Sequence, residues 1–504
     1  MEYFTGLLLG FKVVFQPMNF LMAFTGCLIG TLVGVLPGLG PVAAMSLLLP
    51  VSFHLAPVSA IILLAGIYYG ALYGGSTTSI LVNIPGEAAS VVTCLDGYQM
   101  AKQGRAGPAL AVAAIGSFIA GTIAIVGMMF LSPLLSKAAL SFGPPEYTSL
   151  MVLGFTVLTF LAKTSMPKAL IMAAFGVFLS TIGLDIVSGE RRFTLSIQAL
   201  MDGVGLVPVV MGLFGISEVL LNLEQIGNRP EILSSIGKKI LHIFPTREDW
   251  RKFIPACLRG TIIGFFLGIL PGGGAILASF VAYAIEKKVS KHPEKFGTGE
   301  IEGVASPESA NNSAAQAAFI PLLTLGIPAN AVMAVFFGAL MIHGITPGAM
   351  LIQQNPDIFW GLIASMYIGN VMLLVLNLPL VGLWVKVLLI PYKVLFPLII
   401  LFCLIGVYTI NNSTVDIYIM IIFGVIGYSM KKTEYEGAPL ILALVLGNMF
   451  ETALRQSLMM SDGRFSIFFS KPISCAFMST AIFVLLLPLI LRRRLAVGVD
   501  EGGG

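Results

Sequence analysis

The chain has 504 residues, of which 57% are hydrophobic and only 11% are charged, and its formal net charge is +4. Soluble domains average about 25% charged residues, so composition excludes a water-soluble fold of this size, and the small net charge gives no reason to expect nucleic acid as a partner. The 55 glycines and 28 prolines exclude a simple coiled coil, and the long apolar runs exclude disorder. The chain is therefore predicted to be an all-α polytopic membrane protein with the lipid bilayer as its surroundings.

A membrane-crossing helix needs about 20 mostly apolar residues. In chain order, apolar spans are predicted at 18–36, 58–74, 108–133, 147–162, 167–184, 203–223, 254–270, 275–286, 314–326, 329–343, 358–378, 380–404, 414–428, 437–450 and 473–491. Polar stretches separate them at 224–252 and 286–312. Several spans are too short to cross a bilayer alone, which indicates broken or re-entrant helices.

The sequence contains an internal repeat. Residues 26–40 read GCLIGTLVGVLPGLG and residues 260–274 read GTIIGFFLGILPGGG, with five glycines, a leucine and a proline in register. A second echo follows each copy, at Asn83-Ile84-Pro85-Gly86 and Gly326-Ile327-Pro328-Ala329. These echoes predict a first membrane repeat over 1–223, a basic cytoplasmic linker over 224–252, a second repeat with C-terminal helices over 253–491, and a cytoplasmic tail over 492–504.

Charge placement predicts that the two repeats are inverted. No Lys or Arg lies between Lys12 and Lys102, whereas basic residues flank the second glycine-proline motif on both sides. Because basic residues mark the cytoplasmic side, the second motif should enter and return there as a hairpin, and the first should open to the other side. Each hairpin would carry a Pro-Gly-x-Gly tip, Pro37–Gly40 or Pro271–Gly274.

Broken helices at membrane depth are tolerated where they face protein or a watery cavity, and paired breaks in two halves point to a transport site. Free N–H groups at the tips can hold anions and exposed carbonyls can hold sodium. Polar runs at 74–79 and 307–313 add hydroxyl and amide groups, and Glu308 is the ionisable residue inside them. Helix packing at the glycines and capping by the polar side chains are the alternative explanations.

No constellation for enzymatic chemistry is visible. The four histidines are isolated, the five cysteines lie far apart without metal-ligand spacing, and no phosphate-binding lysine loop is present. We therefore expect no enzyme and no cofactor other than sodium as a coupling ion.

Four segments, 30–42, 66–108, 264–280 and 303–349, resemble the large membrane (permease) subunit of tripartite tricarboxylate transporters, and the likeness covers nearly the whole chain. The resemblance implies a partnership with a small membrane subunit and a periplasmic substrate-binding protein. It also implies import of a carboxylate, such as a tricarboxylate, driven by a sodium or proton gradient, with the chain as a multi-pass protein of the bacterial inner membrane. An elevator-like movement follows only by analogy with other two-repeat transporters.

The family signatures place the expected site on the tips and polar runs. The residues expected to bind substrate are Gly38, Gly40, Ser76, Thr77, Asn83, Gly86, Gly272, Gly273, Gly274, Ser309, Asn311 and Asn312. Those expected to hold sodium are Thr78, Asn83, Asn312 and Thr324. No Lys or Arg lies within these motifs, so backbone dipoles would have to balance the charge of a carboxylate.

Three other functions fit parts of the pattern. A gradient-independent channel or exporter for small organic anions could also use repeated broken helices. A membrane enzyme would need a clustered catalytic set, and a scaffold would gain little from duplicated buried polar motifs.

Overall fold

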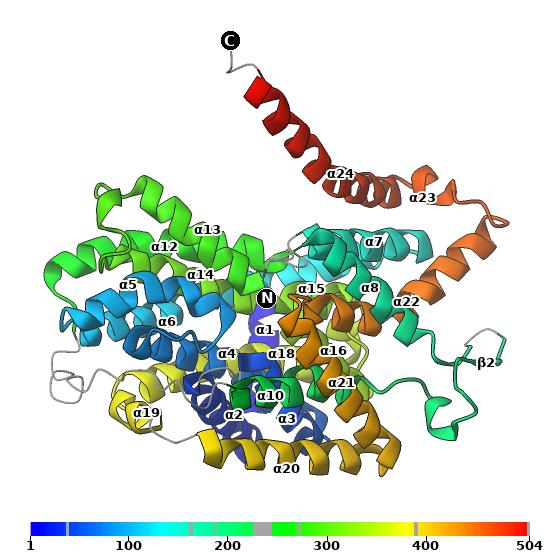
Figure 1. Ribbon diagram of the computed structural model, residues 1–504, viewed down its shortest axis with the longest axis horizontal. Helices are drawn as coiled ribbons and strands as arrows, with labels where there is room; N and C mark the ends of the chain where they lie inside the picture. Colours follow the sequence, from blue (N-terminus) through cyan, green and yellow to red (C-terminus); the bar gives the residue numbers. More distant parts are fainter. Residues whose placement is uncertain are drawn as a thin grey trace. The chain divides into compact units, whose positions relative to one another are not determined.

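The computed structural model describes residues 2–36, 40–160, 165–185, 188–224, 244–270, 274–387 and 392–500 (Figure 1). These residues are almost entirely helical, and their one sheet pairs β1 (Gly183–Leu184) with β2 (Arg191–Arg192) in antiparallel fashion. The chain divides into two compact units, Met1–Lys137 with Gly205–Thr433, and Ala138–Val204 with Glu434–Gly504. They are called unit 1 and unit 2 below.

Unit 1 contains most of the helices. They are α1 (Glu2–Val14), α2 (Pro17–Val35), α3 (Gly40–Ser52), α4 (Pro57–Val82), η1 (Ala88–Ser90), α5 (Val91–Lys102), α6 (Ala106–Ala139), α9 (Leu206–Val210), η3 (Met211–Ile216), α10 (Ser217–Glu224), α12 (Arg247–Ile269), α13 (Gly274–Val289), η4 (Pro293–Lys295), α14 (Glu302–Ala317), α15 (Phe319–Leu325), α16 (Ala331–Ile342), α17 (Leu351–Gln354), α18 (Pro356–Asn377), α19 (Val381–Val387), α20 (Tyr392–Asn411) and α21 (Thr414–Lys432). Unit 2 contains α7 (Pro144–Phe160), α8 (Met166–Ser180), the two strands, η2 (Gln198–Leu200), α22 (Gly437–Met460), α23 (Ile467–Ser470) and α24 (Pro472–Asp500).

Within the described residues, eight helices are long and apolar enough to cross a membrane. They are Pro17–Val35, Pro57–Val82, Ala106–Ala139, Leu206–Glu224, Arg247–Ile269, Pro356–Asn377, Thr414–Lys432 and Gly437–Met460. Shorter apolar helices such as Gly40–Ser52 and Ala331–Ile342 lie between them. The predicted all-α polytopic class is thereby confirmed.

The polar runs fold differently from their sequence appearance. The run at 74–79 continues the apolar span before it, so that α4 is one helix of 26 residues and is buried almost throughout. The second half of the polar stretch 286–312 forms α14, which is also buried although its composition is polar. Small Ala, Ser and Gly side chains allow such a helix to pack closely against its neighbours.

The first glycine strip brings α2 onto α4. A Cβ atom added to Gly26, Gly30 or Gly34 would lie 2.2–2.5 Å from a backbone carbonyl oxygen of Leu63, Ile67 or Ala71. No side chain fits at such a distance, so glycine is what allows the two backbones to meet.

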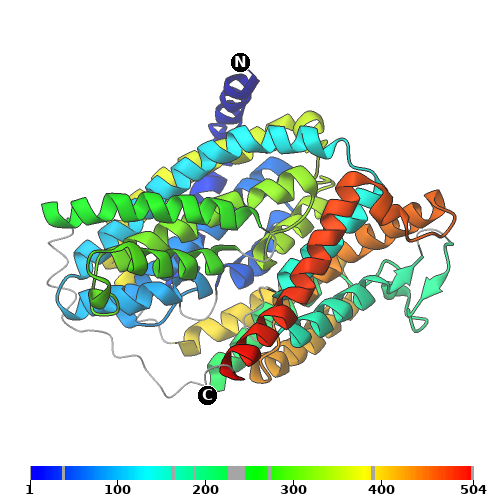
Figure 2. The same ribbon diagram turned by 90° about the horizontal axis from the view of Figure 1, so that it is seen from above.

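The second glycine strip repeats this packing between α12 and α14, which lie side by side with α13 (Figures 1 and 2). Cβ atoms on Gly260, Gly264 and Gly268 would lie 2.2–2.4 Å from the carbonyl oxygens of Ser306, Ala310 and Ala314. The contacted residues are 243 positions after Leu63, Ile67 and Ala71, which is the offset of the second sequence echo.

Backbone conformations at matching positions of the two sequence repeats are also alike. The C-caps of α4 and α15, Asn83 and Gly326, both adopt the left-handed conformation, with φ of 58° and 71°. Gly40 and Gly274, which begin α3 and α13, have φ of 53° and 50°, where a side chain would be strained. The tip residues 37–39 and 271–273 lie outside the described residues, and the inversion of the repeats and the predicted domain boundaries stay predictions.

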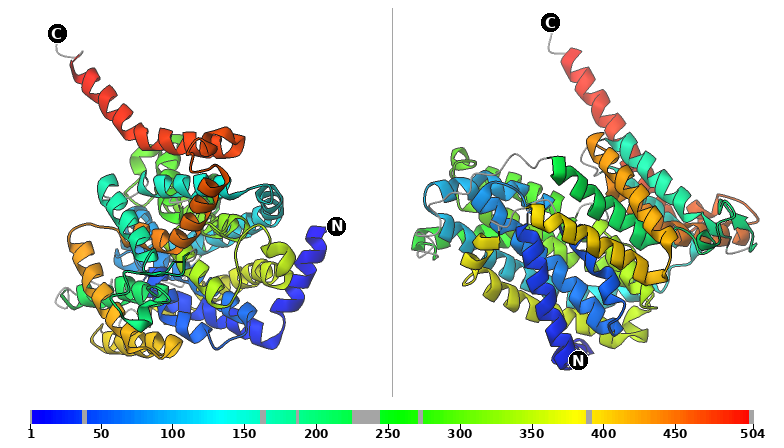
Figure 3. Two further views of the ribbon diagram at one scale, coloured as in Figure 1. Left: turned by 90° about the vertical axis from the view of Figure 1, so that its right-hand side faces the viewer. Right: turned by 60° about the horizontal axis from the view of Figure 1, so that its bottom comes forward.

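The N-terminal helices of unit 1 are joined by a short turn. α1 and α2 are separated by a turn at residues 15–16, and Pro17 begins α2 at an angle to α1 (Figure 3). Proline favours the first position of a helix, where its missing N–H costs no bond.

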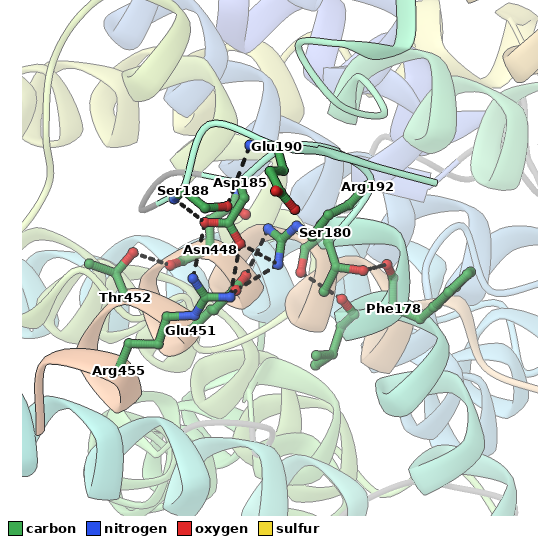
Figure 4. Close-up of polar contacts among 12 residues, drawn as sticks. Phe178, Ser180, Asp185, Ser188, Glu190, Arg192, Asn448, Glu451, Thr452 and Arg455 are labelled. Carbon is green, nitrogen blue, oxygen red and sulfur yellow. Dashed lines mark hydrogen bonds and ion pairs between the residues drawn. The ribbon is translucent and has the colours of Figure 1, made fainter. Parts of the chain in front are cut away.

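Unit 2 is held by a charged network between its strand pair and α22 (Figure 4). Arg192 on β2 lies 2.7 Å from the carboxylate of Glu451, and Arg455 contacts both that carboxylate, at 2.7 Å, and Asp185, at 2.9 Å. Two arginines therefore balance two carboxylates. Asp185 also accepts a hydrogen bond from the Ser188 N–H, which fixes the turn before β2.

Replacing Glu451 by glutamine is expected to lower the free energy of unfolding by about 1–2 kcal/mol, since it removes the negative charge and one of the two acceptor oxygens that Arg192 and Arg455 contact. The loss should appear as a lower midpoint of thermal unfolding in detergent. Glu190→Gln, an exposed change in the same loop, should leave the midpoint unchanged. Equal midpoints for wild type and Glu451→Gln would show that the network contributes nothing to stability.

Candidate functional site

The polar run on α4 remains helical because its hydroxyl groups bond within the helix. Ser76 and Ser79 donate to the carbonyl oxygens of Leu72 and Gly75, at 3.0 and 2.9 Å. Such bonds to the residue four positions earlier satisfy a buried hydroxyl without another partner. Ser76 lies near a second acceptor as well, and this contact connects α4 to α14.

Glu308 on α14 receives hydrogen bonds from two other helices. Its side chain is 1% exposed; Ser76 on α4 donates to its Oε2 at 2.5 Å, and Thr93 on α5 donates to its Oε1. No Lys or Arg among the described residues forms an ion pair with it. A buried carboxyl group without a basic partner is costly and is usually functional in a membrane protein.

The two asparagines of α14 reach in different directions. The amide of Asn312 donates to the Ser117 hydroxyl of α6 at 2.7 Å, and the amide of Asn311 donates to Glu87 at 2.9 Å. The Ser309 hydroxyl and the Asn311 side-chain oxygen are buried, and neither has a hydrogen-bond partner among the residues that the structure describes. Because buried polar atoms are nearly always bonded, such atoms need an explanation, and a ligand or water is one.

A small pocket lies next to these contacts, between α4, α6 and α18. Its lining comes from α4, α6 and α18 and consists of Tyr73, Ser76, Thr77, Leu110, Ala113, Ala114, Ser117 and Asn377. Two lining atoms, the Tyr73 hydroxyl and the Asn377 side-chain oxygen, are buried, and within the described part of the chain they have no hydrogen-bond partner. The pocket therefore combines hydrogen-bonding hydroxyl and amide groups with apolar alanine and leucine side chains.

The structure joins some of the predicted site residues and separates others. Ser76 and Thr77 line the pocket, and Asn312 contacts it through Ser117. Asn83 is exposed at the end of α4, and Gly86 packs against the Gly34 carbonyl, where a Cβ would lie 2.2 Å away. Gly40 and Gly274 begin their helices, whereas Gly38, Gly272 and Gly273 lie outside the described residues.

The residues predicted to hold sodium bond mostly to backbone. Thr78 donates to the Val35 carbonyl at 2.9 Å, next to the first predicted tip, and Thr324 donates to Ile320 within α15 at 2.7 Å. In the described part of the chain no hydrogen bond joins Thr78, Asn83, Asn312 and Thr324 to one another, and sodium binding stays a prediction.

Three pocket residues were not predicted from sequence, namely Tyr73, Ser117 and Asn377. Tyr73 adjoins the polar run on α4, whereas Ser117 and Asn377 are two of several polar residues scattered along apolar helices, and only the folded chain shows that the three converge. Their one sequence signal is a hydrogen-bonding group inside a span, which in lipid is expensive unless it is satisfied.

A second buried carboxylate, that of Asp96 on α5, has a different environment from Glu308. Asp96 is fully buried and accepts hydrogen bonds from the backbone N–H groups of Gly297, Gly299 and Glu300, at 2.8–3.0 Å, and from the Tyr283 hydroxyl at 2.9 Å. Gln103 adds a bond to the Thr298 carbonyl at 2.7 Å. The loop before α14 is thus fastened to α5, which fixes the helix that carries Glu308.

Comparison with known proteins gives the chain its family. The profile of the Tripartite tricarboxylate transporter TctA family matches residues 20–442. The chain belongs to this family. It is therefore a component of a membrane transporter, and the family is one of transporters rather than enzymes.

Three curated proteins are similar to the chain, the first of them over its full length. The "Uncharacterized 52.8 kDa protein in TAR-I ttuC' 3'region" of Agrobacterium vitis is 49% identical over 505 residues, covering 99% of this chain and 100% of the relative. The "Uncharacterized protein in TAR-II ttuC' 3'region" of the same species is 51% identical over 241 residues, 47% of this chain and 100% of its own length. The "Uncharacterized protein MJ1079" of Methanocaldococcus jannaschii is 23% identical over 259 residues, 51% of this chain and 58% of its own. No solved structure matches the chain.

Proposed function

We propose that the chain is the large permease subunit of a binding-protein-dependent secondary transporter that imports a carboxylate, such as a tricarboxylate, using an ion gradient. The family match carries this proposal. The small cavity of about 10 Å³ between α4, α6 and α18 supports it, because Ser76, Thr77, Ser117, Tyr73 and Asn377 bring hydrogen-bonding groups together there. A cavity of this size holds about one water molecule, so substrate binding requires it to widen. Hydroxyl and amide donors can bind a carboxylate group without a buried basic residue.

The pocket lies beside segments that suit alternating access. The glycine strips let α2 and α12 pack onto α4 and α14, and each strip leads to a predicted Pro-Gly-x-Gly tip. The proposed arrangement is two inverted repeats with re-entrant tips that approach the pocket, moving in elevator fashion. N–H groups of the tips would supply the positive potential that the pocket side chains lack.

The proposed partners follow from the family. They are a small membrane subunit and a periplasmic substrate-binding protein, with the assembly in a bacterial inner membrane. Sodium is the proposed coupling ion, held by Thr78, Asn83, Asn312 and Thr324 with backbone carbonyls. The Thr78 contact with the Val35 carbonyl supports this choice, because it places a hydroxyl oxygen at the end of α2.

Uptake into proteoliposomes tests the proposal. The vesicles would hold this subunit and its small partner, with the cognate binding protein outside, and would receive a panel of radiolabelled carboxylates with and without an inward sodium gradient. We expect one carboxylate to accumulate only with the gradient and the binding protein. Flux that ignores both would show a channel or exporter, and proton-driven uptake without any sodium effect would remove the sodium assignment.

Replacing Asn312 by alanine is expected to reduce this uptake about tenfold, because the Ser117 hydroxyl in the pocket loses its hydrogen-bond donor. Asn83→Gly is the sharper variant at the other asparagine, since glycine keeps the left-handed backbone and removes only the amide. Asn448→Ala, an exposed change in unit 2, should transport normally. Normal uptake by both test variants at normal expression would remove these asparagines from the site.

A further inference from the structure

Glu308 is a titratable group that the proposed substrate site does not use. It lies on α14, which packs against α12, α13, α4 and α5. Among the described residues, its oxygens accept hydrogen bonds from two hydroxyl groups, those of Ser76 and Thr93. Ser76 also lines the pocket, so a single side chain separates the carboxyl group from the pocket.

The hydrogen bonds around Ser76 suit a carboxyl group that gains and loses a proton. The Ser76 hydroxyl has one proton and two acceptors within reach, the Leu72 carbonyl at 3.0 Å and Glu308 Oε2 at 2.5 Å. With Glu308 ionised, Ser76 donates to the carboxylate. With Glu308 protonated, the acid can donate to the Ser76 oxygen while Ser76 donates to Leu72. Both states are therefore hydrogen-bonded without any movement of the helices.

Among the residues that the structure describes, no basic group forms an ion pair with Glu308 that would hold it ionised. The titratable groups that interact electrostatically with it include the Tyr73 phenol on α4 and the Cys94 thiol on α5. Three charged groups on neighbouring segments form contacts with other residues. Asp96 on α5 is bonded to the loop before α14, Glu87 is bonded to Asn311, and Arg259 on α12 is paired with Glu286 on α13.

We propose that Glu308 is a proton-binding site of the transport pathway, which takes up a proton through the pocket at Ser76 and releases it during the transport cycle. The proton comes from water on one side, forms an O–H bond at the Glu308 carboxyl group, and returns to water on the other side. No other bond is made or broken. Proton coupling then holds beside any sodium dependence, and this role in transport rests on the proposed function.

The link between α4, α5 and α14 explains how protonation can affect the carrier. Ionised Glu308 draws both the Ser76 and Thr93 hydroxyl groups, whereas neutral Glu308 frees one acceptor and lowers the charge buried between the three helices. Because Ser76 lines the pocket and contacts Glu308, the proton site and the proposed substrate site both involve the Ser76 hydroxyl group. A binding event at either place therefore changes the hydrogen bonds available at the other.

Infrared difference spectroscopy on the purified subunit in detergent tests the proton site without any substrate. The wild type, moved from alkaline to acidic pH, should gain a carbonyl band of a buried protonated carboxylic acid, and Glu308→Gln should lack that band. The matched control Glu302→Gln, on the same helix but outside the pocket, should keep it. If Glu308→Gln shows the same band as the wild type, the proposal is overturned.

A second variant keeps the test decisive if Glu308→Gln fails to fold. Ser76→Ala should retain the band but shift it to higher frequency, because the protonated acid keeps the Thr93 contact and loses the Ser76 oxygen as the acceptor of its proton. An unshifted band in Ser76→Ala would overturn the assigned geometry. This readout does not respond to a role of Glu308 that is merely structural.

Transport separates a coupling role from a binding role. In proteoliposomes with the inward sodium gradient, the binding protein and acid outside, we expect Glu308→Gln to accumulate radiolabelled citrate, or the carboxylate found by the panel, at least about tenfold less than the wild type. Exchange of labelled for unlabelled substrate, which needs no net proton movement, should continue. Wild-type accumulation by Glu308→Gln would overturn coupling through this residue. If the wild type itself moves no carboxylate, the proposed function fails, and the infrared result still decides whether Glu308 binds a proton.

Discussion

Replacing Gly264 by valine is expected to destabilise the protein by about 3 kcal/mol or more, the upper end of overpacking effects. A Cβ atom at this position would lie 2.2 Å from the Ala310 carbonyl oxygen and 2.7 Å from its Cα. Both are backbone atoms in the middle of α14, so α12 and α14 would have to separate along their length. Because α14 carries Glu308 and Asn312, transport should disappear together with stability.

The midpoint of thermal unfolding in detergent and the yield of monodisperse protein would measure the effect. Gly382→Val is the matched control, since Gly382 is exposed and no atom lies within 4 Å of a Cβ built there. Gly30→Val should resemble Gly264→Val, because the Ile67 carbonyl oxygen would lie 2.5 Å from its Cβ. A midpoint for Gly264→Val equal to that of the control would mean that the two helices are not in contact as described.

The glycine strips show what the sequence could predict. The four-residue spacing of Gly26, Gly30 and Gly34 predicts a smooth helix face, and the structure uses that face for close packing. The sequence does not name the partner helix, since the contacts connect residues about 37 positions apart in α2 and α4 and more in α12 and α14. The offset of 243 is visible in the sequence echo of Asn83 and Gly326, but only the contacted carbonyls show that the packing partners of the two strips share it.

The candidate site was predictable in composition but not in connectivity. The polar runs on α4 and α14 stand out in the sequence, and the structure joins them through Ser76 and Glu308. Their contact is 232 residues apart in the chain, and no local rule specifies it. Ser117 and Asn377 carry even less signal, because a polar residue scattered in an apolar span has the same sequence appearance whichever way its side chain points.

Asn83 illustrates how a polar residue acquires two explanations. Its place in the repeat motif suggests a ligand, whereas the structure shows a left-handed C-cap at the end of α4. Asparagine tolerates this conformation better than most residues, and Gly326 occupies the corresponding position in the second repeat. The backbone requirement alone accounts for the motif, so the side chain's role in binding needs the Asn83→Gly variant.

Replacing Asp96 by asparagine is expected to cost about 3 kcal/mol and to release the loop before α14. One oxygen of the carboxylate accepts from three backbone N–H groups, those of Gly297, Gly299 and Glu300, and the other accepts from Gly297 and the Tyr283 hydroxyl. An asparagine side chain has a single acceptor oxygen and would direct an NH₂ group toward other donors. At least one buried donor would then be unsatisfied, and the charge that strengthens the remaining bonds would be lost.

Hydrogen exchange followed by mass spectrometry separates this local effect from general unfolding. In Asp96→Asn the amides of residues 297–300 should exchange much faster than in the wild type, whereas the amides of α22 in unit 2 should change little. Asp202→Asn, an exposed aspartate in unit 2, should leave both regions unchanged. Unaltered exchange at 297–300 would mean that Asp96 does not hold this loop. Faster exchange there, with reduced uptake and an intact infrared band from Glu308, would show that Asp96 positions α14 for transport without binding the proton itself.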